Sequence, residues 1–343
     1  MTSFRGDGWF APGEGGYTFL GTSSLERGLA YGNGELYLVS RAGGQNIRRL
    51  DSSTGLEVGN LIMTGISVGT FPVNKVAVAA DGTIYAANMV TSQNASGSPF
   101  RVYSWATVGS SPVTNYSGAP LPLARVGDST LAVTGTGSNT RLISGFAAGG
   151  TNPGQNGYAV VNPTAGTADA VAFVGTPPAI GDFRLGLTIG PGGQVWGNQG
   201  SLALRETSYS GVSGTLLGTA TGLISVAERA MAYATVNGLN ILATISTGDS
   251  TVRIYNASNP LALSLLGSGN NTTGTLTSNG NATGDVAFGA QTDNGDGTTT
   301  IQLYTLSSNQ GIQAFNVTVP EPTTGALLGL GISALIAMRR SRK

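Results

Sequence analysis

The sequence contains no cysteine and no histidine. Without cysteine the chain can form no disulfide, and it has no thiolate to act as a nucleophile or a metal ligand. Without histidine it lacks the commonest general base and the commonest transition-metal ligand. We therefore expect no cofactor, no metal and no enzymatic activity, and the sequence singles out no catalytic or cofactor-binding residue.

Charge is also scarce. Charged residues make up 10% of the 343 positions, against about 25% in a typical soluble domain. Four of the 17 basic residues and one of the 17 acidic residues lie in the segment 319–343, so the rest of the chain is slightly acidic. A nucleic-acid-binding protein needs a basic face, and we expect no nucleic-acid partner.

What the sequence has in abundance is glycine, with 54 residues, and hydrophobic residues, at 40%. This hydrophobic content, at zero net charge, argues against an intrinsically disordered chain. The length suits one large domain or two ordinary ones. The composition fits an exported all-β protein with many tight turns.

From residue 28 onward the chain repeats a loose unit of an apolar stretch, a tight turn and a second strand. The clearest copies are 28–40, with the turn Gly32-Asn33-Gly34, and 76–88, with the turn Asp81-Gly82. Asn-Gly and Asp-Gly between apolar stretches form the strongest local hairpin signal, because the central residues need positive φ. The turns centre on residues 33, 81, 128, 192, 237 and 296, a spacing typical of propeller blades with insertions in loops.

Two further strands follow in most units. Third strands are predicted at 47–51, 100–105, 158–162, 202–206, 252–256 and 312–317, and outer strands at 60–65, 113–118, 171–175, 214–218 and 261–267. The sixth unit lacks an outer strand, and residues 17–21 have the pattern to supply it, which would leave no open sheet edge. The sequence thus predicts an all-β fold, a single β-propeller at residues 1–318. Six blades are favoured, with seven as the alternative, and 17–21 would close the last blade.

The segment 323–338 carries no charge and is followed at once by Arg339, Arg340, Arg342 and Lys343. A helix of this length spans roughly 24 Å, short of the roughly 30 Å hydrocarbon core. Basic residues can snorkel and a bilayer can thin at modest cost. The pattern predicts one membrane helix with a basic stop, which places residues 1–319 outside the cytoplasm. A buried C-terminal core helix is the alternative.

Pro320 and Pro322 hold Glu321 in an extended segment just before the apolar run, because proline fixes its own φ and biases its predecessor away from helix. A rigid, exposed carboxylate beside a membrane helix is a suitable recognition element for a processing enzyme. Together with Gly329-Leu330-Gly331 inside the apolar run and the basic end of the chain, this order of features closely resembles the PEP-CTERM sorting signal.

The resemblance implies recognition by an exosortase, a membrane-embedded cysteine transpeptidase-like enzyme expected to cleave at or near Pro320-Glu321-Pro322. It implies an exported bacterial protein, anchored by its C-terminus before processing and then found at the outer surface or outside the cell. Exopolysaccharide is a further candidate partner, because such bacteria make it. Residues 1–20, with Asp7 and Glu14, have no apolar core and form no signal peptide, so we expect the leader upstream of Met1.

Residues 27 to about 135 resemble an uncharacterised family of propeller-like domains carried by PEP-CTERM proteins. The resemblance rests on the stretches 28–32, 71–76, 81–85 and 125–129. It implies a fold and carries no activity.

Two groups of residues invite interpretation as sites. Residues 293–297 resemble the start of a calcium loop, but glycine at 295 and the lack of a distal Glu favour a hairpin turn, and Asp81 and Asp128 are likewise interpreted as turn residues. A set of aromatic residues could line a sugar-binding mouth, although packing between blades is favoured. This set is Tyr103, Trp105, Trp196, Tyr209 and Tyr255.

Three functions remain open. The favoured one is a binding or structural propeller at the cell surface or in the exopolysaccharide matrix. The alternative is a propeller enzyme acting on glycans or lactones, for which a cluster of carboxylates at the channel mouth would be evidence. The third is a cytosolic propeller with a C-terminal core helix and no sorting.

Overall fold

The computed structural model describes residues 4–147, 157–173, 175, 178, 181–198, 203–222, 224, 225 and 227–321. In these residues the chain forms 24 strands and four short 3-10 helices, and no α-helix. The predicted all-β class is confirmed. The apolar helix predicted at 323–338 lies outside the described residues, and within them no helix has the length and apolarity needed to cross a bilayer.

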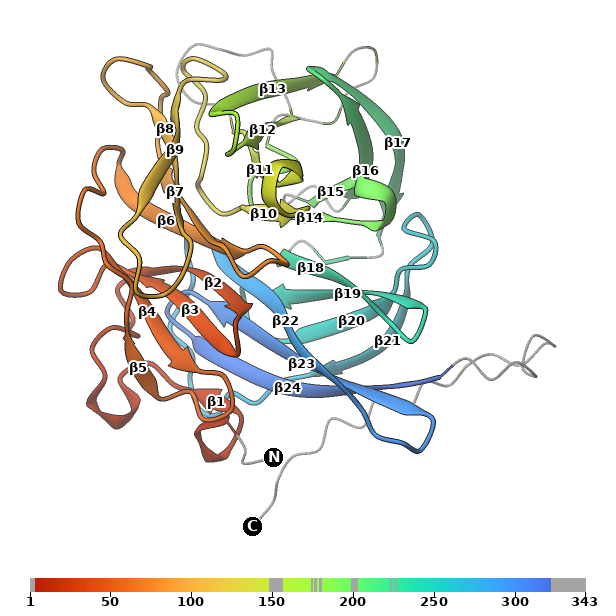
Figure 1. Cartoon of the computed structure of the whole chain (residues 1–343). Coiled ribbons are helices and arrows are strands. Elements are labelled where there is room, and N and C mark those ends of the chain that lie inside the picture. Colours follow the sequence, from red (N-terminus) through yellow and green to blue (C-terminus); the bar gives the residue numbers. More distant parts are fainter. Residues whose placement is uncertain are drawn as a thin grey trace.

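Four sheets of four strands and one sheet of eight form a propeller-like ring (Figure 1). The first sheet contains β2 (Glu26–Gly32), β3 (Glu35–Ser40), β4 (Asn46–Asp51) and β5 (Glu57–Asn60). The second contains β6 (Phe71–Val78), β7 (Ile84–Met89), β8 (Phe100–Trp105) and β9 (Val113–Gly118). Another contains β18 (Glu228–Val236), β19 (Leu239–Ser246), β20 (Val252–Asn256) and β21 (Ser264–Gly269). The last contains β22 (Gly284–Asp293), β23 (Thr298–Ser307), β24 (Gly311–Pro320) and β1 (Trp9–Phe10).

The eight-stranded sheet consists of two antiparallel series joined edge to edge. One series is β10 (Ala132–Thr134), β11 (Arg141–Gly145), β12 (Gly157–Asn162) and β13 (Thr167–Phe173). The other is β14 (Gly186–Ile189), β15 (Val195–Asn198), β16 (Ala203–Ser210) and β17 (Ser213–Thr221). The junction is a short parallel pairing of β13 with β17, through the pairs Ala172–Ser213 and Phe173–Gly214. The free edges, β10 and β14, both face the centre of the ring (Figure 1).

Two of the predicted hairpin turns have the backbone conformation that their sequences favour. Asn33 and Gly34 between β2 and β3 have φ of 54° and 78°, and Asn237 and Gly238 between β18 and β19 have φ of 49° and 73°. Positive φ at both central residues gives the hairpin turn that matches the twist of the flanking strands.

The predicted third strands all overlap observed strands, and 100–105 and 252–256 coincide with β8 and β20. The outer strand predicted at 113–118 coincides with β9. The prediction at 60–65 is wrong over most of its length, because β5 ends at Asn60. Leu61, within that range, is instead buried in the core between the first two sheets.

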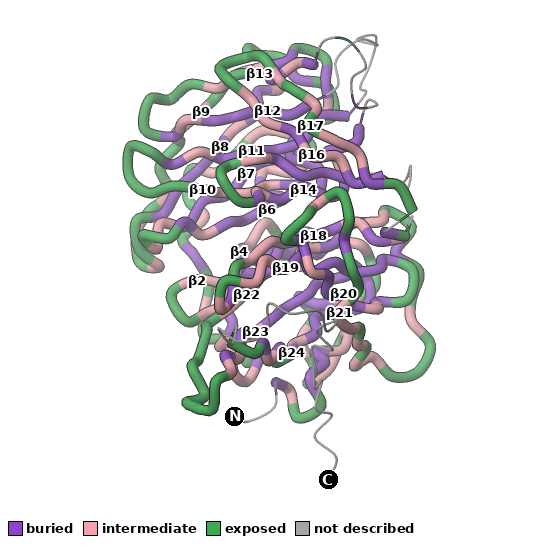
Figure 2. The backbone as a smooth tube through the Cα atoms, turned by 90° about the vertical axis from the view of Figure 1, so that its right-hand side faces the viewer, coloured by how far each residue is buried: buried purple, intermediate pink, exposed green. Residues whose placement is uncertain are grey.

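The core lies between neighbouring sheets, and burial follows the strands while exposed residues gather in the connections (Figure 2). In β7 every residue is buried, because the sheet packs against a neighbour on either face. Trp105 and Trp196 are both 0% exposed. The indole N–H of Trp105 donates to the carbonyl of Ile62 at 2.8 Å, which satisfies its polar atom in the interior.

The N-terminal segment closes the ring, but not through the predicted residues. Trp9 and Phe10 pair with Gln313 and Ile312 of β24, whereas 17–21 form turns and bends. Phe19 and Leu20, 3% and 1% exposed, instead fill an apolar cluster beneath the closing strand. Their apolar pattern therefore reflects burial and not strand pairing.

The first prediction tests the role of β1 in closing the ring. Phe10 is 0% exposed and packs against Tyr17 and Phe19 at centroid distances of 5.6 and 6.0 Å. Phe10→Ala should lower the free energy of unfolding by about 3–5 kcal/mol, measured by denaturant titration. The control Val113→Ala, at a side chain 59% exposed on β9, should change it by no more than about 0.5 kcal/mol. Equal effects of the two variants would contradict the closing role of β1.

Candidate functional site

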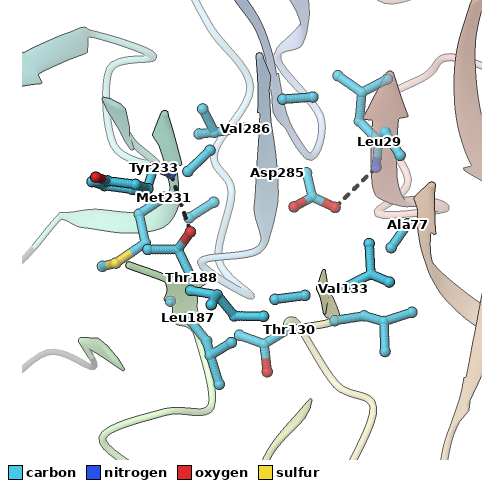
Figure 3. A pocket seen from close by; sticks show the side chains of 18 of the residues that line it. Leu29, Ala77, Thr130, Val133, Leu187, Thr188, Met231, Tyr233, Asp285 and Val286 are labelled. Carbon is cyan, nitrogen blue, oxygen red and sulfur yellow. Dashed lines mark hydrogen bonds between the residues drawn. The ribbon is translucent and has the colours of Figure 1, made fainter. Parts of the chain in front are cut away.

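The inner strands of the ring enclose a cavity of about 250 Å³. It is lined by residues of β2, β6, β10, β14, β18 and β22 and of the segments leading into them. Figure 3 shows mainly aliphatic side chains around this space, including Val133, Leu187 and Val286. The ring of Tyr233 extends away from it and meets Trp196 edge-on at 5.4 Å. Among the described residues that line the cavity, Asp285 is the one carboxylate.

A fully buried lysine connects three of the inner strands. Lys75 on β6 is 0% exposed, and its Nζ lies 2.6 Å from Asp285 Oδ2. Nζ also donates to the carbonyl oxygens of Arg27 on β2, at 3.0 Å, and Gly284 on β22, at 3.1 Å. An ammonium has three N–H donors, so each has an acceptor. A buried charge is tolerated when it is paired and hydrogen-bonded in this way.

Asp285 is held by hydrogen bonds and lines the cavity. Its Oδ2 accepts from Lys75 and from the backbone N–H of Leu29 at 3.0 Å, and Figure 3 shows the second oxygen directed toward the middle of the cavity. Burial raises the pKa of Asp285, and the ammonium of Lys75 offsets this only in part, so the pKa stays above its ordinary value. The cavity therefore presents a carboxylate, together with the hydroxyl groups of Ser129, Thr130 and Thr188, among mainly aliphatic side chains.

A second charged group lies at the starts of the inner strands. Asp128, 1% exposed, precedes β10 and accepts from Arg125 Nη2 at 2.6 Å and from Arg184 Nε at 2.5 Å. Arg27 Nη1 on β2 lies 3.8 Å from the same carboxylate. Three guanidinium groups from different parts of the ring thus surround one carboxylate.

The positive charges of the arginines shift the pKa values within this group. Burial raises the pKa of Asp128, but the hydrogen bonds and charges of Arg125 and Arg184 outweigh burial and hold the pKa below its ordinary value. Burial lowers the pKa of Arg27, Asp128 opposes this, and Arg125 and Arg184 lower it further. The arginines are therefore close enough to repel one another.

A fourth arginine and a second carboxylate extend the group. The guanidinium carbons of Arg41 and Arg27 lie 3.7 and 5.6 Å from the ring centroid of Phe71. Burial and the charge of Arg27 lower the pKa of Arg41 to about 10. Burial raises the pKa of Glu26, which is 0% exposed and feels the charge of Arg41. We call this set the arginine cluster; its members are Arg27, Arg41, Arg125, Arg184, Glu26 and Asp128.

The structure describes two of the residues predicted to form the sorting site. Pro320 is the last residue of β24 and lies opposite Thr298 on β23. The N–H of Glu321 donates to the carbonyl of Gly297 at 2.7 Å, and both Pro320 and Glu321 are exposed. Pro322 and the basic stop of Arg339, Arg340, Arg342 and Lys343 lie outside the described residues.

The other predicted turn residues behave as turns, with one exception. Asp293 Oδ1 accepts from the N–H of Gly295, and Asp296 Oδ1 from that of Thr298, in the hairpin between β22 and β23. Asp81 likewise accepts from the N–H of Thr83. In the part of the chain that the structure describes, no group of three or more acidic side chains could hold a metal ion.

The exception is Asp128, for which the turn prediction is wrong. It precedes β10 and binds arginines, while β10 and β11 are joined by residues 135–140. The signal that could have revealed this role is the position of the charged residues, which are few in this chain. Charged residues recur on the inner strands and in the segments that lead into them. They are Arg27, Lys75, Asp128, Arg184, Glu228, Arg229 and Asp285.

The candidate aromatic residues do not form a mouth. Tyr103, Trp105, Trp196 and Tyr255 are at most 5% exposed and pack in the cores between sheets. Tyr209 packs edge-on against Tyr158 at 6.0 Å. Packing between sheets, the favoured interpretation, is confirmed for these residues.

The fold places the chain among propeller-like proteins. The structure is similar to that of a DUF4623 family protein from Bacteroides eggerthii, with a TM-score of 0.60 and 16% identity over 85% of this chain and 70% of that one. It is similar to the allergen Mala s 1 of Malassezia sympodialis, with a TM-score of 0.53 and 13% identity over 84% and 90%. It is also similar to XC5397 of Xanthomonas campestris, described as a gluconolactonase, with a TM-score of 0.52 and 12% identity over 84% and 85%. At these identities the similarity establishes the fold alone.

The comparison of the C-terminal segment with known families gives a more specific result than the fold does. Residues 318–343 match the PEP-CTERM protein-sorting motif, so the recognition made from the sequence is confirmed. The motif marks an exported protein sorted by exosortase. No curated protein matches the chain in sequence.

The Lys75–Asp285 pair generates a second prediction. Lys75→Met keeps about the length of the side chain and removes the cation, so Asp285 is left buried without its counter-ion, at an expected loss of about 3–5 kcal/mol at neutral pH. The folded-state pKa of Asp285 is raised, and removing Lys75 raises it further. The carboxyl's contribution to stability is then present below the ordinary aspartate pKa of about 3.9 and is lost as the pH rises through the folded-state pKa.

Denaturant unfolding of Lys75→Met at a series of pH values from about 3 to 8 measures this dependence. The double variant Lys75→Met with Asp285→Asn carries no charge at either position, and its stability relative to the parent should not show the same decline with rising pH. A pH-independent loss in Lys75→Met would contradict the role assigned to the pair.

Proposed function

We propose that this chain is an exported, exosortase-processed protein whose β-propeller serves as a binding module at the cell surface or in the extracellular matrix. The observation that carries the proposal is the place of the sorting motif. Residues 318–343 begin within β24, so cleavage near Pro320 would leave the ring of sheets complete. The exposed Pro320 and Glu321 are accessible to a processing enzyme.

We assign six blades to this propeller. Six inner strands line the cavity, and the eight-stranded sheet divides into two four-stranded series at the parallel junction of β13 and β17. In this assignment β1 supplies the outer strand of the sixth blade.

A binding role is supported by the cavity between the inner strands. Its wall combines aliphatic side chains with hydroxyl groups and the Asp285 carboxylate, and in small-ligand pockets a few such polar groups fix the ligand's orientation. The ligand suited to it is small and carries a hydrogen-bond donor that reaches Asp285. The matrix exopolysaccharide is the larger partner that the sorting signal suggests for the processed protein.

An enzyme acting on glycans or lactones is the second candidate, favoured by the similarity in fold to XC5397. Glycoside hydrolysis commonly needs two carboxyl groups roughly 5–9.5 Å apart. Asp285 is the one carboxylate among the described lining residues, and its Oδ2 is paired with Lys75. Binding is therefore the simpler use of this cavity.

Processing makes a third prediction. Mass spectrometry of the mature protein from its native host should show that everything beyond about Pro322 is lost. Glu321→Gln removes the carboxylate from the recognition segment and should leave the uncleaved chain, ending at Lys343, in the membrane fraction. Asp293→Asn, at an exposed acid in the nearby hairpin, should be processed like the parent. An intact Lys343 on a soluble cytosolic parent protein would refute the sorting proposal.

A fourth prediction separates binding from catalysis. The purified protein, assayed against a panel of aldonolactones and aryl glycosides, should give no turnover that depends on Asp285. The comparison uses Lys75→Met with Asp285→Asn, which removes both charges of the pair together. Turnover in the parent that this double variant abolishes, while it remains folded, would establish the enzyme instead.

A further inference from the structure

The arginine cluster contains more positive charge than its carboxylates balance. Its four guanidinium groups face two carboxylates, Glu26 and Asp128, both at most 1% exposed. Two hydrogen-bonded arginines already satisfy Asp128, so the third and fourth add repulsion among like charges. Retaining that many cations in a stable fold calls for a further anion.

Several donors of the cluster have no acceptor. Arg27 Nε, Arg41 Nη1 and Arg125 Nε are shielded from solvent and have no hydrogen-bond partner. The side chain of Arg27 is only 7% exposed. A buried donor without an acceptor costs about 1–3 kcal/mol, and more when it is charged. Glu26 Oε2, an acceptor in the same cluster, likewise has no donor, so these arginine donors need an acceptor that the cluster's own carboxylates do not supply.

The cluster is also accessible. The side chains of Arg125 and Arg184 are each 27% exposed. Arg184 contacts Asp128 through Nε, and its two Nη groups donate to no residue that the structure describes. A guanidinium fork binds planar or tetrahedral oxyanions through two parallel N–H donors.

We propose that the arginine cluster binds an oxyanion, with Arg184 and Arg125 as its principal donors and Arg27 behind them. The chemistry fits the carboxylate of an acidic sugar as well as a free sulfate or phosphate. The site differs from the cavity described above, since none of the four arginines lines that cavity, and the inference does not depend on the proposed function.

The test measures binding of oxyanions to the purified full-length chain in mild detergent by isothermal titration calorimetry. The probes are sulfate, phosphate and glucuronate, with glucose and chloride as neutral and simple-anion controls at matched ionic strength. Saturable binding of at least one oxyanion, absent with glucose and chloride, is the expected result. Preference for glucuronate identifies an acidic sugar, and preference for sulfate or phosphate identifies a free inorganic anion. Oxyanions that bind no better than chloride would overturn the proposal.

Variants assign the binding to this cluster. Arg184→Gln should weaken it about tenfold or more, because a charge-assisted fork is lost, while Arg184→Lys, which keeps charge without the fork, should give an intermediate loss. Arg101→Gln, at a half-buried arginine on β8, should bind like the parent.

Asp128→Asn supplies the opposite perturbation. Removing the internal carboxylate frees its arginines, so the variant should bind the oxyanion more tightly than the parent, provided its unfolding curve confirms a folded state. If Asp128→Asn does not fold, the comparison of Arg184→Gln with Arg184→Lys decides the matter. Unchanged affinity in Arg184→Gln would refute the site.

Discussion

Closing the ring is the constraint on which the rest of this structure depends. An open ring would leave unpaired backbone donors and acceptors on a sheet edge. Two devices hold the ring together, although β10 and β14 keep free edges toward its centre. Trp9 and Phe10 add a strand to β24 from the opposite end of the chain, and the ammonium of Lys75 bonds to β2 and β22 from β6. The inner strands held in this way line the central cavity.

The protein has few charged residues. The Lys75–Asp285 pair and the arginine cluster are two groups of them in different environments. The Lys75–Asp285 pair is locally neutral and nearly saturated with hydrogen bonds, which suits a structural element that also offers one oxygen to the cavity. The arginine cluster is neither neutral nor saturated. Most members of both groups lie on inner strands or in the segments that lead into them, where strands that are remote in sequence converge.

The sorting motif is joined to the ring in a way that suits its removal. β24 pairs with β23 as far as Pro320, whereas β1 pairs with it only at Ile312 and Gln313. Cleavage beyond Pro320 would remove no strand and expose no new edge. The segment that directs export is thus separable from the domain that it delivers.

The sequence by itself determined the fold class, most of the strands and the sorting signal. These depend on local features: alternation, Asn-Gly turns, and the ordered motif 318–343. Only the tertiary structure decided which segment closes the ring, because the apolar pattern of Phe19 and Leu20 is the same for a buried plug and for a strand. It alone brought Arg27, Asp128 and Arg184 together, since their contact spans three inner strands and no local spacing encodes the proximity of residues so far apart in the chain.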